Sequence, residues 1–128
     1  MNRQIVITAS LLGMLAVIAG AFGAHGLKTL VNSDQLEVWH TAVQYQFYHV
    51  FALLFLSVYA QRNTGLVKSS FYLFVFGILF FSGSLYLFVL ADVIKWHLPA
   101  IIGVITPVGG LLFILGWLML ALAAIRNK

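Results

Sequence analysis

Four long apolar runs dominate this chain and limit what it can fold into. The runs cover residues 5–24, 42–60, 69–91 and 98–125. Each is close to the roughly 20 residues that an α-helix needs to cross the hydrocarbon core of a bilayer. They take up most of the 128 residues, so we expect no separate soluble domain. We therefore predict an all-α, integral membrane four-helix bundle, a single transmembrane domain over residues 1–128 with helices at about 5–25, 35–60, 69–91 and 98–125.

The composition agrees with a bilayer environment and argues against several functions. Hydrophobic residues make up 62% of the chain and charged residues only 8%, whereas soluble domains carry about 25% charged residues. The net charge of +4 comes from basic residues scattered at the ends of the runs, so no patch could bind nucleic acid. Cysteine is absent, which excludes thiolate metal sites and cysteine nucleophiles, and no phosphate-binding loop or hydrolase motif occurs. The expected partner is the lipid bilayer.

The basic residues also predict how the chain is oriented. Counting lysine and arginine in the short connections assigns a side to each connection, because the cytoplasmic side carries the excess. One side has five basic residues and no acid: Arg3, Arg62, Lys68, Arg126 and Lys128. The other side has two basic residues and all three acids: Lys28, Lys95, Asp34, Glu37 and Asp92. We expect a multi-pass protein of the cell inner (plasma) membrane with both termini in the cytoplasm.

The second run carries the most unusual chemistry of the chain, in the stretch HTAVQYQFYHV at residues 40–50. On a helix with about 100° per residue, most of its polar and aromatic side chains share one face. Polar groups within a span usually face the protein interior or a wet cavity. We predict a polar pocket that opens outward and is built from these residues: His25, His40, Thr41, Gln44, Tyr45, Tyr48, His49 and Thr106.

Two interpretations of this polar face stay open. The first is a network of ordinary interhelical hydrogen bonds with tyrosines at the membrane interface. The second is a ligand site for a metal, haem, quinone or lipid headgroup, since neutral imidazole can bind metal ions and haem iron. A metal would need three or four converging ligands, and the spacing of the histidines specifies no such set. The sequence therefore assigns no particular cofactor or metal.

Small residues recur in the first and fourth helices, where they let neighbouring backbones approach closely. We predict helix packing at Gly13, Gly20, Gly23, Pro107, Gly109 and Gly110. Gly26 is expected to end the first helix in the left-handed conformation that glycine favours. In the third helix, Ser70, Gly77 and Ser84 recur at seven-residue spacing, which predicts a packing seam.

Two further expectations concern the ends of the helices. Ser33 or Asp34 is expected to cap the second helix, with Glu37 in its first turn. Trp39 and Trp96 lie near the outer ends of spans, so we expect both to anchor the protein at the membrane interface.

The segments GAFGAHGL, WHTAVQYQFYHVFALL and ITPVGGLLFILGW together resemble a known family. They are similar to the signature segments of the small four-helix membrane proteins called domain of unknown function 423, which are related to eukaryotic transmembrane protein 256. The resemblance covers nearly the whole chain. It implies a bacterial inner-membrane protein, and it brings no established biochemical activity and no residue roles.

The leading functional prediction is a small, non-enzymatic accessory or assembly component. We expect it to associate with itself or with a membrane-protein partner through glycine-rich faces. The alternative is a ligand-binding membrane protein that uses the outward-facing histidine and tyrosine pocket. A third hypothesis, a small channel or transporter, depends on a kink at Pro107 and on the segment from Ser82 to Ser84.

Overall fold

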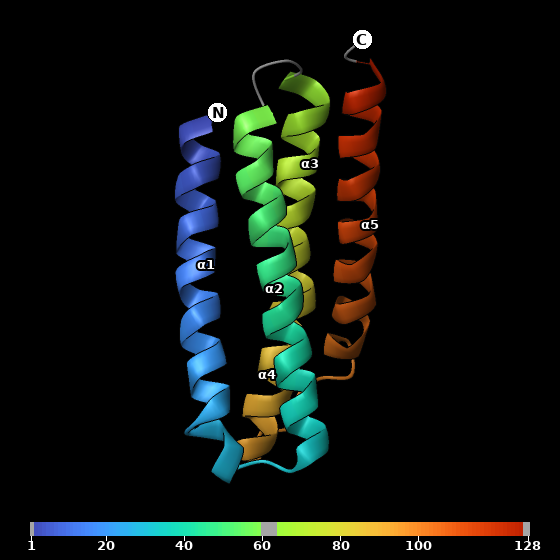
Figure 1. The fold of residues 1–128 in the computed structure, drawn as a ribbon. Helices are drawn as coiled ribbons and strands as arrows, with labels where there is room; N and C mark the ends of the chain where they lie inside the picture. Colours follow the sequence, from blue (N-terminus) through green and yellow to red (C-terminus); the bar gives the residue numbers. More distant parts are fainter. Residues whose placement is uncertain (1, 60–63, 127–128) are drawn as a thin grey trace.

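The structure is a computed structural model that describes residues 2–59 and 64–126. These residues are almost entirely helical and include no strand. The elements in chain order are α1 (Asn2–Ala24), the 3₁₀ turn η1 (Leu27–Thr29), α2 (Ser33–Tyr59), α3 (Thr64–Gly77), the π-helical turn η2 (Ile78–Ser82), α4 (Gly83–Val93) and α5 (Ile102–Arg126) (Figure 1). α3, η2 and α4 follow one another without a break, so they form a single rod. Four helices are long and apolar enough to cross a membrane, which confirms the predicted fold class.

Helices that follow one another in the chain are also neighbours in space. α1 packs chiefly on α2, α2 packs on η2 and α4, and α5 packs on α3 and η2. In Figure 1, α1 and α5 lie on opposite sides of the bundle with α2 and the α3–α4 rod between them. The start of α1 and the end of α5 lie at the same end of the molecule, as an even number of spans requires.

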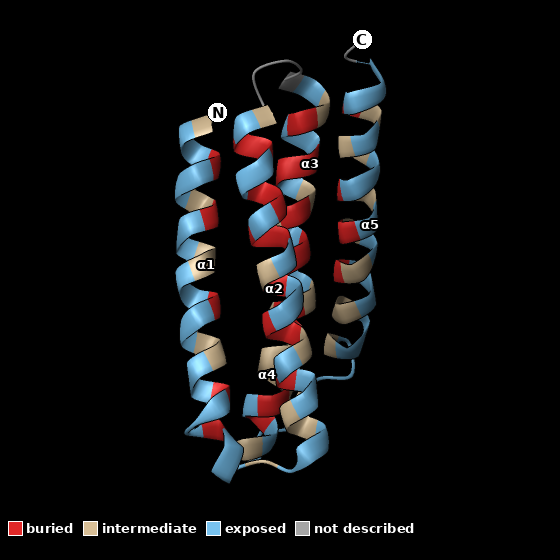
Figure 2. Ribbon diagram, viewed as in Figure 1, coloured by how far each residue is buried: buried red, intermediate tan, exposed pale blue. Residues whose placement is uncertain are grey.

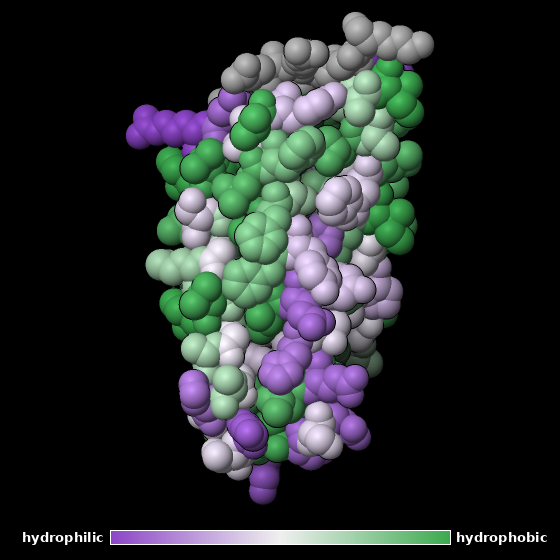
Figure 3. All heavy atoms as spheres, in the orientation of Figure 1, coloured by the Kyte–Doolittle hydropathy of each residue, from purple (hydrophilic) through white to green (hydrophobic). Residues whose placement is uncertain are grey.

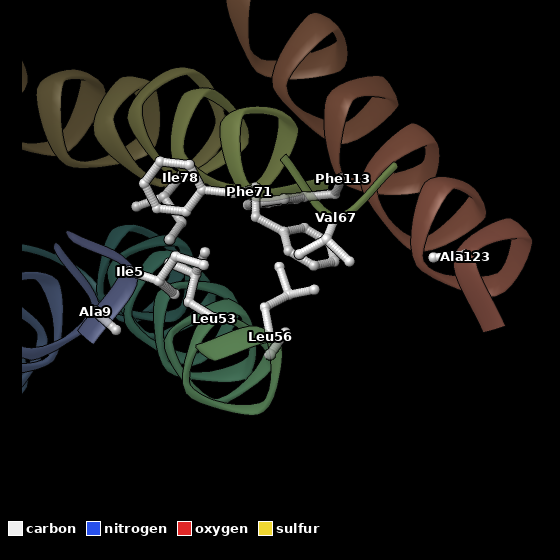
Figure 4. Close-up of a cluster of buried hydrophobic side chains, with 11 residues drawn as sticks. Ile5, Ala9, Leu53, Leu56, Val67, Phe71, Ile78, Phe113 and Ala123 are labelled. Carbon is white, nitrogen blue, oxygen red and sulfur yellow. The ribbon is translucent and has the colours of Figure 1, made fainter. Parts of the chain in front are cut away.

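The core consists of two clusters along the bundle axis. The cluster nearer the chain ends includes Leu53, Phe74 and Phe113, and parts of it are drawn in Figure 4. The cluster nearer the opposite end is built around Trp39 and Leu27. The outward faces of the helices are exposed (Figure 2) and many of their side chains are apolar (Figure 3). An exposed surface this apolar suits acyl chains rather than water.

The start of α2 differs from the expectation. The backbone N–H of Gln35 donates to Asn32 Oδ1 at 2.8 Å, and the Asn32 N–H donates back to Gln35 Oε1 at 3.1 Å. This reciprocal pair is a capping box. The predicted cap at Ser33 or Asp34 was therefore wrong by one or two residues, because Asn32 has an equally good acceptor and a glutamine three residues later.

The end of α1 also differs. Gly26 has φ −66° and ψ −48°, which is the right-handed helical region, so the predicted left-handed termination was wrong. No positive φ is needed at Gly26, because the chain continues from it into the right-handed 3₁₀ turn η1. The left-handed conformation occurs instead at Lys95, with φ 56°, where α4 ends. The Trp96 N–H donates to Ala91 O at 2.8 Å and the Lys95 N–H donates to Asp92 O at 3.3 Å, which is a Schellman arrangement.

The third and fourth spans contain two local surprises. The π-helical turn η2 interrupts the third span, although the sequence ILFFS has nothing that distinguishes it from ordinary α-helix. α5 begins at Ile102 rather than near residue 98, and it continues as one helix through Pro107. Pro107 is the sixth residue of this helix, beyond its first turn, so it removes the backbone hydrogen bond that an N–H there would have donated to the Gly103 carbonyl.

Candidate functional site

His49 lies at the centre of the candidate site and is held rigidly. Its Nδ1 is 2.7 Å from the carbonyl oxygen of Tyr45, and its Nε2 is 3.1 Å from Trp117 Nε1. A carbonyl can only accept and an indole N–H can only donate. His49 is therefore the neutral tautomer with the proton on Nδ1. Its ring stacks on Phe113 with a centroid distance of 3.6 Å and an interplanar angle of 6°.

A groove lies beside His49 between α2 and α5. Its volume is about 820 Å³, within the usual range of about 300–1,000 Å³ for small-molecule sites. Phe81 of η2 also lines the groove, because the rod behind α2 passes close to α5 at this height. The lining residues are Tyr45, Tyr48, His49, Phe81, Pro107, Gly110, Leu111, Phe113, Ile114 and Trp117. We call this space the α2–α5 groove.

Two tyrosine side chains border the α2–α5 groove and remain partly exposed. Tyr45 is 39% exposed and Tyr48 is 54% exposed. The Tyr45 ring packs on Phe81 at 4.7 Å and on Tyr48 at 5.6 Å. Neither hydroxyl is hydrogen-bonded to any residue in the part of the chain that the structure describes. In lipid, a hydroxyl without a partner is energetically unfavourable.

The other residues of the predicted pocket lie in different places. Thr106 adjoins the groove residue Pro107 and shares a hydrogen bond with Ser84 on α4. The Thr41 hydroxyl donates to Glu37 O within α2 at 3.1 Å, and Gln44 is exposed on α2.

His25 and His40 do not line the α2–α5 groove. Both are exposed, and His40 lies next to Gly23, on the side of α2 that faces α1. Within residues 2–59 and 64–126, no three histidine, aspartate or glutamate side chains are grouped so that they could hold a metal ion. The four histidines thus form no single cluster.

The packing glycines make close contacts inside the molecule. Gly13, Gly20 and Gly23 all face α2, and a Cβ at Gly23 would lie 2.6 Å from the Trp39 ring. Gly109 lies against the backbone of η2, whereas Gly110 lines the α2–α5 groove. Gly13, Gly20, Gly23 and Gly109 therefore make contacts within one chain, whereas Gly110 borders the groove. Association through glycine-rich faces stays a prediction.

A second polar network, centred on Gln46, was not predicted from the sequence. Gln46 Nε2 donates to Leu12 O of α1 at 2.8 Å, and the Tyr86 hydroxyl of α4 donates to Gln46 Oε1 at 2.7 Å. The Trp39 indole donates to Ala19 O at 2.8 Å. Gln46 falls between Val43 and Val50, and a single polar side chain on that apolar face was the available signal. Trp39 is buried, so its predicted role as an interface anchor was wrong.

The serines of the third span take part in contacts between helices. Ser70 donates to Gly116 O at 2.9 Å, and Ser82 donates to Ala42 O at 2.7 Å. Ser84 meets Thr106. The segment on which the channel hypothesis depended therefore has its hydroxyl groups engaged in packing.

Comparison with known proteins identifies the family of the chain. Residues 19–110 match the family described as "Protein of unknown function (DUF423)". The chain belongs to the DUF423 family.

Similar DUF423 relatives come from several bacteria. The chain is 43% identical to a UPF0382 membrane protein of Staphylococcus aureus over 124 residues, which is 97% of each chain. It is 39% identical to the UPF0382 membrane protein YwdK of Bacillus subtilis, over 97% of this chain and 98% of the relative. A UPF0382 membrane protein of Haemophilus influenzae is 35% identical over the whole of this chain and 98% of its own. No solved structure matches the chain.

These relatives and the four candidate spans agree with each other. This DUF423 protein is a multi-pass membrane protein, and helical spans in bacterial relatives fit the inner (plasma) membrane. The names of the relatives state no activity.

Proposed function

We propose that this DUF423 protein binds a small hydrophobic molecule from the bilayer in the α2–α5 groove. The observation that carries the proposal is the pair of tyrosine hydroxyls, at Tyr45 and Tyr48, that lack a partner among the described residues beside a groove of about 820 Å³. Ligand sites are typically concave, mostly apolar and supplied with a few polar groups that orient the ligand. A ligand oxygen would give these hydroxyls the hydrogen bonds that lipid tails cannot give.

The wall formed by His49 and Trp117 favours binding over catalysis. Both ring nitrogens of His49 already have partners. A role as general acid or base, or as an axial ligand to haem iron, would require His49 to lose its hydrogen bond with Trp117. A hydrophobic ligand can instead use the wall as it stands. This makes lipid or quinone binding better supported than the metal and haem alternatives.

Two glycines on α5 provide a matched test. Gly110 lines the groove, and a Cβ there would meet only Phe81 Cδ2 at 3.8 Å, so Gly110→Leu should fill the groove without a backbone clash. Gly103 has open space beside it, so Gly103→Leu makes the same change elsewhere on the helix. Each variant is extracted from native membranes in polymer discs, and its bound molecules are measured by mass spectrometry.

The expected result is a molecule that copurifies with the wild-type protein and with Gly103→Leu but is lost from Gly110→Leu. The same set of molecules in all three preparations would contradict binding in the groove.

A second candidate function, an assembly component, is favoured by the exposed ridge of α2. Exposed and half-buried residues recur there at alternating spacings of four and three: Glu37, Thr41, Gln44, Tyr48, Phe51, Phe55 and Val58. This spacing is that of a coiled-coil seam. Gln44 lies within the span, and its side-chain amide is not hydrogen-bonded to another described residue. In a pair of parallel copies, each Gln44 amide could donate to the other and accept from it.

A further inference from the structure

The α2–α5 groove is lined without any charged side chain. Its lining residues include no lysine, arginine, aspartate or glutamate. His49 is neutral, because its Nδ1–H donates a hydrogen bond to the Tyr45 carbonyl oxygen and its Nε2 accepts one from the Trp117 indole. A phosphate headgroup calls for cationic donors, which the lining lacks, and no carboxylate adds to the attraction that aromatic rings alone offer a cation. The lining therefore matches a neutral ligand.

The walls of the groove are mostly flat rings. Phe113 and His49 stack with only 6° between their planes, and Trp117 meets His49 at 5.9 Å and 59°. Tyr45 packs on Phe81 at 4.7 Å and is also stacked with Phe113 at 6.3 Å. Aromatic faces pack well against another planar ring, in offset or edge-to-face contact. A flexible acyl chain would gain less from such walls than a flat ring would.

The polar contribution comes from two tyrosine hydroxyls, which can donate hydrogen bonds. A saturated hydrocarbon would leave both hydroxyls without a partner. A ring that carries carbonyl oxygens would accept from them, and each bond formed away from water strengthens binding.

The groove is also continuous with apolar surface. Leu111 and Ile114 line it and are themselves exposed on the outer face of α5. An apolar tail attached to the ring could leave the groove along these side chains and enter the surrounding acyl chains.

We infer that the α2–α5 groove takes a neutral, flat ring with carbonyl oxygens and an apolar tail, the chemistry of a lipid-soluble quinone. The ring packs against the aromatic lining and its oxygens accept from the Tyr45 and Tyr48 hydroxyls. This inference depends on the proposed function, that the groove binds a molecule from the bilayer, and adds the class of that molecule.

The test uses the full chain in phosphatidylcholine nanodiscs. Decylubiquinone is titrated while tryptophan fluorescence is recorded, because Trp117 lines the groove and quinones quench indole emission. Gly110→Leu keeps every tryptophan but fills the groove, so it reports quenching by quinone that is merely dissolved in the bilayer. Decylbenzene, a flat ring with the same tail and no oxygen, is then added as a competitor.

We expect saturable quenching in the wild type and none above background in Gly110→Leu. Tyr45→Phe and Tyr48→Phe should each weaken decylubiquinone binding about two- to tenfold, the effect of one hydrogen bond. Tyr72→Phe, at an exposed tyrosine of α3 that does not line the groove, should leave binding unchanged. Decylbenzene should compete only at about tenfold or greater excess.

Three results would overturn the inference, and they differ in what they say of the groove. If decylbenzene competes as well as decylubiquinone and the phenylalanine variants bind normally, the groove binds hydrophobic molecules but does not recognise ring oxygens. Suppose that decylubiquinone does not bind, and that a phospholipid copurifies with the wild type but not with Gly110→Leu. The groove is then a binding site, but its ligand is not a quinone. If neither probe binds and nothing that copurifies is lost in Gly110→Leu, the proposed function fails as well.

Discussion

At Gly109 the backbone of α5 touches the backbone of η2. A methyl group on Gly109 would overlap the Phe81 backbone nitrogen, and a backbone cannot move aside as a flexible side chain can. We expect Gly109→Ala to destabilise the protein by about 1–3 kcal/mol, as overpacking does. Gly110→Ala is the control, because its new Cβ would make only an ordinary contact at 3.8 Å. Thermal unfolding of both variants in detergent measures the difference, and equal midpoints would contradict the close approach.

The hydrogen bond between Trp117 and His49 gives a second prediction at the residue scale. Trp117→Phe keeps a ring but removes the only donor to His49 Nε2 in the described structure. Leaving this nitrogen unpaired should cost about 1–3 kcal/mol. Trp96→Phe, at an exposed tryptophan, should change stability little.

Nitrogen NMR of the imidazole tests the same contact directly. We expect His49 to be protonated at Nδ1 and unprotonated at Nε2 in the wild type. A protonated Nε2 would show that Nε2 does not accept from Trp117. The argument against haem ligation would then no longer hold.

Along α2, exposed polar side chains lie well within the span, namely Gln44, Tyr45 and Tyr48. If two copies pair along its ridge, Gln44→Leu removes the amides that would join them. Membrane hydrogen bonds contribute about 0.6 kcal/mol on average, so two lost bonds should weaken pairing roughly sevenfold. Energy transfer between labelled copies in liposomes, at varied protein-to-lipid ratio, measures this. Gln4→Leu on α1 is the matched control, and wild-type protein that stays monomeric at every ratio would reject the assembly hypothesis.

Sequence patterns predicted the spans well because bilayer thickness fixes helix length. They could not predict η2, since a π-helical turn depends on how α3 and α4 meet α2 and α5. Ser82 bonds to α2, and the neighbouring Phe81 backbone touches Gly109. No short-range signal in ILFFS encodes these contacts, which come from residues far along the chain.

The candidate site was predicted only in part, for a reason that involves the whole bundle. Periodicity shows which residues of α2 share a face, and it groups Tyr45, Tyr48 and His49. It does not show which neighbour that face meets. α1 packs on one side of α2, and His49 faces Trp117 of α5 on another. His25 at the end of α1 is thus kept away from His49, although the sequence predicts both histidines in the outer half of the membrane.

Orientation of the whole molecule remains a prediction from its basic residues. Because the chain has no cysteine, a single introduced cysteine can be labelled without background. In spheroplasts, a membrane-impermeant maleimide should label Ser33→Cys, at the first residue of α2, but label Gln4→Cys only after permeabilisation. The reverse pattern would place both termini outside. Labelling of both variants in intact spheroplasts would indicate that the chain inserts in two orientations.

The packing of each helix on its neighbours in the sequence has a consequence for biosynthesis. As the ribosome extends the chain, α1 and α2 can leave the translocon as a hairpin whose main contacts are already made. The α3–α4 rod then finds the exposed side of α2, and α5 arrives last against a surface that is complete. No helix must wait for a distant partner. The bundle can therefore be assembled in the order in which it is synthesised, with little time for an unpaired Gln46 to face lipid.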